Sequence, residues 1–290
     1  MNFLPILFQP VIIIGAGRSG TNILRDTLTQ FESLGTWDCD EINYIWRHGN
    51  MHYPSDEFPA YLATFKVREF LRKQFAQLAR RLKVKYIVEK TCANSLRVEY
   101  VDRVFPEAKY IYIVRDGRDV VASTIKRWKA PLDIPYILKK TRYVPLSDAP
   151  YYAWRYLNNC VFRLYSYEKR LAFWGPRFDN MGTMLQTRSL AQVCAMQWVR
   201  CVERAEEAFA MISRDRVISI KYEELVAAPE EHIASITDFL GFGVVTDRLN
   251  GAVKQISASN IGKWKQDLSP NEQKEIEPII HSTMNKHGYH

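Results

Sequence analysis

Several features that would place this chain of 290 residues in a class at once are missing from it. No stretch approaches the roughly 20 consecutive apolar residues that span a bilayer. The apolar start at residues 1–10 has neither the basic residues nor the small-residue cleavage site of a secretory signal. We therefore expect no membrane span, no signal peptide and a cytoplasmic location.

The chain also lacks cysteine and histidine patterns typical of metal sites. Its five cysteines are odd in number and none stands in CxxC spacing, so they predict neither a zinc site nor a disulfide framework and favour a reducing compartment. His48 and His52 stand four residues apart, a spacing that could hold a metal on a helix. No third ligand follows at a suitable spacing, so we interpret both as surface histidines and expect no metal.

What is present is an ordinary globular composition with a basic charge balance. With 47% apolar and 25% charged residues, the length suits one α/β domain over residues 1–290 better than two equal domains. The net charge of +8 fits an anionic cofactor, an anionic acceptor, nucleic acid or a membrane surface, and charge alone does not separate them. A nucleic-acid partner has only this charge in its favour, and we expect none.

Short apolar runs alternate with helical patterns along the chain. The runs have the character of strands buried on both faces of a parallel sheet, and they cover residues 11–14, 86–88, 109–114 and 217–220. Helical patterns occupy residues 21–31, 55–82 with Ser55 as the cap, a stretch ending near 128, 190–212 and a stretch ending near 240. This alternation predicts a three-layer α/β/α fold of the P-loop-like kind, with a central, mostly parallel sheet.

The pattern degrades between residues 129 and 187. This stretch is rich in proline, tyrosine, tryptophan and arginine, with one helix expected at 151–173. We interpret it as a helical insertion over the edge of the sheet, forming a lid or an acceptor-binding surface.

A glycine-rich turn follows the first strand and opens a helix. Residues 15–20 fit G-x-G-x-x-G, which is consistent with a Rossmann dinucleotide site, and Asp38, Asp40 and Glu41 lie about 20 residues on, where a ribose-binding acid belongs. That acid should end a second strand, however, and residues 31–40 make a poor strand. The turn also fits a phosphate loop in which the lysine of nucleotide triphosphatases is missing and Arg18 stands inside the loop. A kinase-like phosphotransferase therefore stays open beside the dinucleotide enzyme.

The segments after the later strands favour a third possibility. Arg115 ends the third strand and Ser123 stands eight residues on, which resembles the 3′-phosphate-binding element of sulfotransferases that use 3′-phosphoadenosine 5′-phosphosulfate (PAPS). The loop around Arg18 resembles the 5′-phosphosulfate loop of that family in the arginine-bearing form of tyrosylprotein and many bacterial members. Residues 89–91 (EKT) resemble its lysine element, and 221–241 resemble its closing strand–helix unit. The resemblance runs from residue 11 to about 264 in separated blocks.

The resemblance implies a transferase that moves the sulfuryl group of PAPS in line to an acceptor hydroxyl or amine and releases 3′-phosphoadenosine 5′-phosphate (PAP), with no metal required. Arg18 and Lys90 would stabilise charge on the leaving oxygen. Glu41 would be the general base, with Asp40, His48 or His52 as alternatives. The residues expected to bind the nucleotide are Gly17, Arg18, Ser19, Gly20, Thr21, Asn22, Arg115, Ser123, Tyr222 and Lys263. The acceptor, which could be a small molecule, a carbohydrate or a peptide, is not identified.

Overall fold

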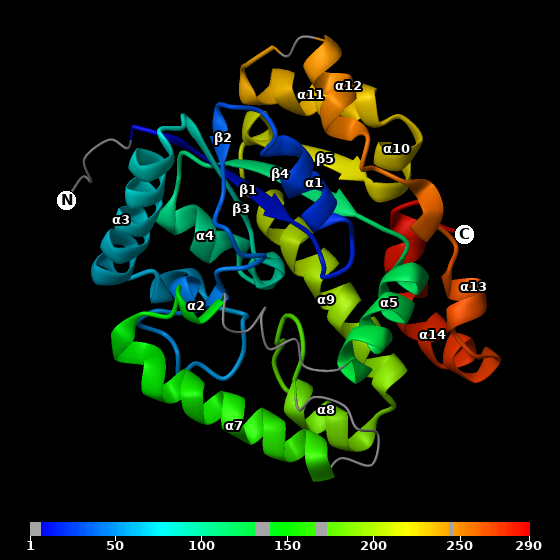
Figure 1. The fold of residues 1–290 in the computed structure, drawn as a ribbon. Helices are drawn as coiled ribbons and strands as arrows, with labels where there is room; N and C mark the ends of the chain where they lie inside the picture. Colours follow the sequence, from blue (N-terminus) through cyan, green and yellow to red (C-terminus); the bar gives the residue numbers. More distant parts are fainter. Residues whose placement is uncertain (1–6, 131–139, 166–172, 244–245) are drawn as a thin grey trace.

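The structure is a computed structural model, and it describes residues 7–130, 140–165, 173–243 and 246–290. Its centre is a five-stranded sheet in the order β2-β3-β1-β4-β5 with every pair parallel (Figure 1). The strands are β1 (Gln9–Ile14), β2 (Leu34–Gly35), β3 (Tyr86–Lys90), β4 (Lys109–Val114) and β5 (Val217–Lys221). The parallel sheet expected from the alternating pattern is confirmed.

Successive side chains of a strand point to opposite faces of the sheet. Alternate residues of the inner strands are therefore buried in two different apolar layers. Val11 and Ile13 of β1 pack with α1 (Thr21–Leu28), α11 (Pro229–Leu240) and α12 (Thr246–Val253). Ile12 and Ile14 pack on the opposite face with α3 (Phe65–Leu82), α4 (Val98–Val104) and α9 (Leu190–Phe209). Helices thus cover both faces of the sheet, as Figure 1 shows.

The remaining helices surround the carboxyl ends of the strands. They are α2 (Asn43–Trp46), α5 (Gly117–Lys129), α7 (Ala149–Tyr165), α8 (Met181–Thr187), α10 (Tyr222–Ala227), α13 (Trp264–Asp267) and α14 (Pro270–Lys286). α5 and α14 pack with α9 in an apolar cluster of their own. The last segment of the chain therefore returns to the helix that follows β4, beside the pocket described below. No helix among these ranges is both long and apolar enough to cross a membrane.

The predicted helix 55–82 is too long at its amino end. The helix α3 starts at Phe65, with the Thr64 side chain as its cap, and not at Ser55. Pro59 has no backbone N–H for a helical hydrogen bond, and the buried Asp56 is held by an ion pair with Arg47 at 2.7 Å. These two residues keep the segment before Thr64 out of the helix.

Two further expectations need small corrections. The poor strand at 31–40 is β2, only two residues long, at the edge of the sheet beside β3. The helix expected at 151–173 is α7, which begins at Ala149; residues 166–172 of the predicted range lie outside the described residues, and Phe173 is not helical.

Candidate active site

A pocket of about 810 Å³ opens at the carboxyl ends of β1, β3 and β4, where open parallel sheets bind ligands. Among the predicted nucleotide-binding residues, only Ser19 is absent from its lining, and Ser19 is buried directly behind it. The three predicted catalytic residues also line it: Arg18, Glu41 and Lys90. The fold therefore brings into one cavity predicted residues from six separate segments of the chain: 17–22, 41, 90, 115–123, 222 and 263.

The glycine turn has the backbone of a phosphate loop. Arg18 and Gly20 both have positive φ, at 74° and 91°, and α1 begins directly after them at Thr21. A Cβ atom on Gly20 would lie 2.4 Å from the Tyr222 ring, so the position needs glycine for two reasons. The turn therefore directs the amino end of α1 into the pocket, where its backbone dipole favours an anion.

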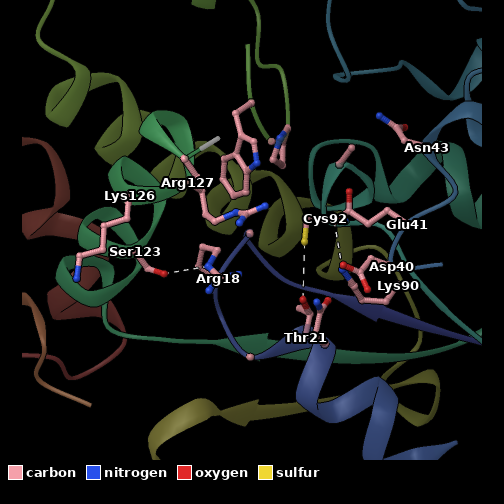
Figure 2. Close-up of a pocket in the computed structure, with 18 of the residues that line it drawn as sticks. Arg18, Thr21, Asp40, Glu41, Asn43, Lys90, Cys92, Ser123, Lys126 and Arg127 are labelled. Carbon is pink, nitrogen blue, oxygen red and sulfur yellow. Dashed lines mark hydrogen bonds and ion pairs between the residues drawn. The ribbon is translucent and has the colours of Figure 1, made fainter. Parts of the chain in front are cut away.

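Arg18 and Ser123 meet across the pocket. The Arg18 Nε donates to Ser123 Oγ at 2.9 Å, which links the glycine turn to α5 (Figure 2). Burial lowers the pKa of Arg18, and the nearby cations Arg127 and Arg115 lower it further. A cluster of guanidinium groups at one end of a cavity is an electrostatic site for an anion.

Arg115 forms the centre of a second anion site. Its Nη1 donates to the Arg18 carbonyl at 3.0 Å, its Nη2 donates to the Asn260 carbonyl, and its guanidinium lies 4.5 Å from the centre of the Tyr222 ring. Asp119, one turn along α5, pairs with Arg115 at 3.3 Å. The guanidinium is thus fixed at the end of β4.

The same Asp119 attaches the C-terminal loop to this site. Its carboxylate accepts the Gly262 N–H at 2.8 Å and the Trp264 N–H at 2.9 Å. Lys263, between them, lines the pocket and donates to Asn260 Oδ1 at 2.8 Å. The loop therefore brings one more cation beside Arg115.

Two buried polar atoms at these anion sites lack partners among the described residues. They are Ser19 Oγ in the glycine turn and Arg115 Nε. Buried donors are nearly always satisfied in native proteins, and Arg115 lines the pocket, so its Nε is available for a ligand. Ser19 does not line the pocket, so its Oγ marks the glycine turn only as a place where a polar group lacks a partner.

Lys90 and Glu41 form a partly buried ion pair on the other side of the pocket. Lys90 Nζ lies 3.2 Å from Glu41 Oε1, and the same oxygen accepts the Cys92 N–H at 3.3 Å (Figure 2). Burial raises the pKa of Glu41, but the Lys90 ammonium, Lys140 and the hydrogen bonds from Cys92 outweigh it and hold that pKa at about 2. Burial lowers the pKa of Lys90, and Glu41 more than restores it. Both groups are therefore charged at neutral pH.

The alternative bases occupy less suitable positions. Asp40 lines the pocket but pairs with Arg25 at 3.4 Å. His48 bonds Asp148 at 2.9 Å, and the His52 ring packs on Tyr151 with centroids 4.9 Å apart. Neither histidine belongs to the pocket lining. Asp38 also lies outside the lining, so it is not placed to bind a ribose in this pocket.

A buried network that sequence reasoning missed fixes the position of Glu41. Thr91 Oγ1 donates to Glu89 Oε1 at 2.5 Å and accepts the Ile42 N–H at 3.1 Å. At the following residue, Asn43 Oδ1 accepts from Arg97 Nη2 at 2.6 Å. The chain on the carboxyl side of Glu41 is thereby held at two successive residues.

Arg127 was also missed, and Trp174, expected only as one of the aromatic residues of the insertion that would suit an acceptor, makes an unforeseen contact with the glycine turn. Arg127 stands one helical turn after Ser123 and its side chain reaches into the pocket (Figure 2); the spacing of four on one helix was a signal that could have found it. Trp174 lies over the glycine turn, with its ring 3.6 Å from where a Gly17 Cβ would be. Nothing in the sequence near Trp174 indicates this contact, because it joins segments more than 150 residues apart.

Chemically, the pocket holds two cationic sites at one end and a carboxylate paired with a lysine at the other. Among the described residues, no three histidine, cysteine or acidic side chains gather as metal ligands. The arrangement can bind a doubly anionic nucleotide, neutralise charge that develops on it and accept a proton nearby.

Comparison with known proteins gives this geometry a context. The model of the sulfotransferase family matches residues 10–141 and 173–247 of this chain. Omega-hydroxy-beta-dihydromenaquinone-9 sulfotransferase Stf3 of Mycobacterium tuberculosis is 21% identical over 159 residues, which are 55% of this chain and 29% of that protein. The protein of the same name from Mycobacterium bovis matches equally. The chain thus matches less than a third of the length of these curated relatives.

Solved structures show the same fold. The sulfotransferase domain from the curacin biosynthetic pathway superposes with a TM-score of 0.60 at 14% identity, over 99% of both chains. The mouse sulfotransferase SULT7A1, complexed with PAP, superposes with a TM-score of 0.51 at 13% identity, over 96% of this chain and 85% of that one.

Proposed function

The chain belongs to the sulfotransferase family, and on that basis we propose that it transfers the sulfuryl group of PAPS to a hydroxyl or amine of an acceptor. The observation that carries the proposal is the pair of anion sites, one at the glycine turn and one around Arg115. A nucleotide with a 5′-phosphosulfate and a separate 3′-phosphate needs both sites. A kinase substrate such as ATP or a dinucleotide such as NAD carries no 3′-phosphate that would occupy the site around Arg115.

We assign the donor-binding roles by position. Arg18 and the backbone of residues 17–22 would hold the 5′-phosphosulfate at the amino end of α1. Arg115, Ser123 and Lys263 would hold the 3′-phosphate, and the Tyr222 ring would lie against the adenosine. The orphaned Arg115 Nε would gain a partner. The PAP present in the mouse structure supports this choice of nucleotide.

When bound, PAPS would supply an activated sulfuryl group on a good leaving group. The protein would contribute mainly position and charge, as in phosphoryl transfer. Lys90 and Arg18 would neutralise charge on the leaving phosphate oxygen, each donor contributing about 3 kcal/mol at such sites. Glu41 would accept the proton of an acceptor hydroxyl, because it is the pocket carboxylate beside Lys90.

The low pKa of Glu41 fits this role only if the pair with Lys90 loosens. While Lys90 stays beside it, the carboxylate at a pKa of about 2 is a weak base. A donor that draws the Lys90 ammonium toward its own oxygen would remove the main charge that lowers this pKa. Glu41 would then become a stronger base only when the donor is in place.

We further propose that residues 129–187 contribute the acceptor side of a single domain over residues 1–290. Phe173, Trp174 and Tyr152 from this stretch line the pocket. The acceptor would be a small molecule, a carbohydrate or a peptide. A cytoplasmic location is in keeping with the buried thiols of Cys39, Cys92 and Cys201.

The proposal is tested by incubating the protein with PAPS labelled in its sulfur and a set of hydroxyl and amine acceptors. We expect acceptor-dependent release of PAP and label in the acceptor, with the rate strongly reduced in Lys90→Met. PAPS that is neither bound nor consumed by the protein would refute the proposal, as would equal transfer by Lys90→Met.

A further inference from the structure

The wall of the pocket across from the glycine turn comes from α7 and α2. Tyr152 and Arg155 of α7 stand three residues apart, so they are neighbours on one face of that helix. Both line the pocket, together with Asn43 and Tyr44 of α2. The Tyr44 and Tyr152 rings meet edge to face with centroids 4.4 Å apart. Because Tyr44 follows Glu41 by three residues, this wall continues directly from the proposed base.

Tyr152 presents an unused hydrogen-bond donor in this wall. Its hydroxyl oxygen is buried and has no partner among the described residues. Burial raises the pKa of this phenol well above its usual value, so the hydroxyl keeps its proton. A buried hydroxyl without a partner is costly, and a ligand in the pocket is the partner it can reach.

Arg155 presents an unused positive charge beside that hydroxyl. Within the described ranges it forms no ion pair, and its recorded contact is a distant one with the Tyr151 ring, 5.6 Å from the guanidinium carbon to the ring centre. Arg177 lies close enough for Arg155 to lower its pKa, which burial lowers first. The neighbourhood of Arg155 is therefore positively charged.

The nearby carboxylates are already engaged. Asp148, which faces Tyr152, bonds His48 at 2.9 Å. Asp56 lies between Arg47 at 2.7 Å and Arg97 at 3.4 Å. Each of these acids is thus engaged by another side chain, so neither is the counter-ion of Arg155.

The donor nucleotide does not account for this charge either. Its anionic groups are assigned to Arg18, Arg115, Ser123 and Lys263, which come from the glycine turn, the β4–α5 segment and the C-terminal loop. Arg155 and Tyr152 come from α7, which runs along the lower edge of the view in Figure 1, away from α13 at the right. The sites assigned to the donor therefore do not include this pair, and it is left for a second anion.

We propose that the acceptor of this enzyme is itself an anion, and that Arg155 and the Tyr152 hydroxyl bind an oxyanion on it, a carboxylate, phosphate or sulfate, away from the group that is sulfated. This rests on the proposed function for the identity of the donor. The Tyr44 and Tyr152 rings give the body of the acceptor a flat apolar contact. The forked guanidinium and the phenol O–H together match the oxygen edge of such a group.

The test uses the protein saturated with PAP, so that the donor anion sites are filled. Binding of 4-hydroxybenzoate and of its neutral analogue 4-hydroxybenzamide is then measured by calorimetry, with inorganic sulfate as a probe that has no ring. We expect the benzoate to bind about tenfold or more tightly than the amide, as a charge-assisted hydrogen bond implies. Arg155→Gln should abolish this preference, and Tyr152→Phe should reduce it.

Two variants keep the result interpretable. Arg155→Lys retains the charge and should keep part of the preference even if Arg155→Gln folds poorly. Arg188→Gln removes an exposed arginine outside the pocket and should leave the preference unchanged.

Each outcome separates the two proposals. If PAP itself does not bind, the proposed function fails. If PAP binds but the oxyanions bind no better than the amide, or do not bind at all, the anionic acceptor is refuted and the proposed function stands. An undiminished preference in Arg155→Gln likewise refutes the subsite.

Discussion

The Lys90–Glu41 pair places two opposite charges side by side in the pocket. The Lys90 ammonium is proposed to stabilise the leaving group, and the Glu41 carboxylate to accept the proton of the acceptor. The Lys90 side chain is nearly enclosed, at 3% exposed, while that of Glu41 is 26% exposed and partly open to the pocket. The two partners come from the loop before α2 and from the end of β3. The two groups therefore reach each other only in the folded chain, and each sets the charge state of the other.

Replacing Glu41 tests its role as base. We expect Glu41→Gln to lower kcat by about 10²–10⁴, the range that general-base catalysis contributes, while PAP binds with unchanged affinity. Single-turnover transfer from labelled PAPS measures the first quantity and calorimetry the second. Asp40→Asn is the matched control, because Asp40 lines the same pocket but pairs with Arg25, and it should retain most activity. A Glu41→Gln enzyme with normal kcat would exclude Glu41 as the base.

Glu89 gives the protein a stability that depends on pH near neutrality. Burial raises the pKa of this carboxyl from 4.5 to about 7, so the folded state favours the protonated form. The corresponding stability is complete below pH 4.5 and is lost as the pH rises through 7. Between pH 5.5 and 8.5 the wild type should lose about 2 kcal/mol relative to Glu89→Gln.

Urea unfolding of both proteins at several pH values measures this difference. The comparison uses the change with pH, since the glutamine also alters the hydrogen bonds to Thr91 and Asn94. Parallel pH dependences in the two proteins would show that Glu89 does not titrate in this window.

At the level of single residues, the sequence revealed those positions that follow a strand. Arg18, Lys90 and Arg115 each stand at or just after the end of a predicted strand, and parallel strands end at one edge of the sheet. Arg127 and Trp174 could not be found in this way. Trp174 reaches Gly17 across the fold, and no local pattern encodes such a contact.

At the level of elements, the glycine turn depends on one position with two constraints. A side chain at Gly20 would be strained by the positive φ of 91°, and it would clash with the Tyr222 ring. We expect Gly20→Ala to weaken PAP binding at least about tenfold, since the turn must shift and left-handed backbone costs about 1–2 kcal/mol for a non-glycine residue.

Calorimetry with PAP and thermal unfolding together check this prediction. Gly251→Ala is the matched control, because this glycine lies in α12 with open space around it. It should bind PAP normally and unfold at a slightly higher temperature, as alanine favours a helix. Normal PAP affinity in Gly20→Ala would contradict the role of the turn.

Hydrogen bonds from one side chain of α9 reach the segment 173–177, whose Phe173 and Trp174 also pack on the apolar cluster around α9. Gln197 Nε2 donates to the carbonyls of Trp174 at 3.0 Å and Pro176 at 2.7 Å. Gln197→Met should release this segment, so that its amides exchange hydrogen faster while PAP affinity stays unchanged. Gln273→Met removes a similar bond, to the Leu268 carbonyl, and should leave the segment protected. Unchanged exchange in Gln197→Met would show that other contacts hold the segment.

Element boundaries were harder to predict than element types. Ser55 and Thr64 are both capable helix caps, and the periodic pattern extends across both. The structure selects Thr64 because Pro59 and the buried Asp56 prevent helix between them. Burial of Asp56 depends on Arg47 and Arg97, which lie in other segments, so the sequence pattern alone could not show it.

At the level of the whole molecule, the pocket depends on the C-terminal segment returning to α5. Asp119 holds Gly262 and Trp264, and Arg115 holds Asn260, so the last 30 or so residues close the nucleotide side of the pocket. The alternation of strands and helices predicted the three layers and the parallel sheet. The alternation could not predict that the C-terminal segment returns to α5. That contact is made through the backbone N–H groups of Gly262 and Trp264 and the carbonyl of Asn260, and every residue carries such backbone groups.

The central claim is that Arg115 belongs to a site for a 3′-phosphate, and calorimetry of PAP and ADP tests it most directly. These ligands differ chiefly in having the second phosphate on the 3′-hydroxyl or on the 5′-phosphate. We expect the wild type to bind PAP at least about tenfold more tightly than ADP. Arg115→Ala should remove that preference, and Arg118→Ala, which lies outside the pocket and pairs with Asp116, should keep it. Equal binding of PAP and ADP by the wild type would contradict the claim and return the kinase-like phosphotransferase to consideration.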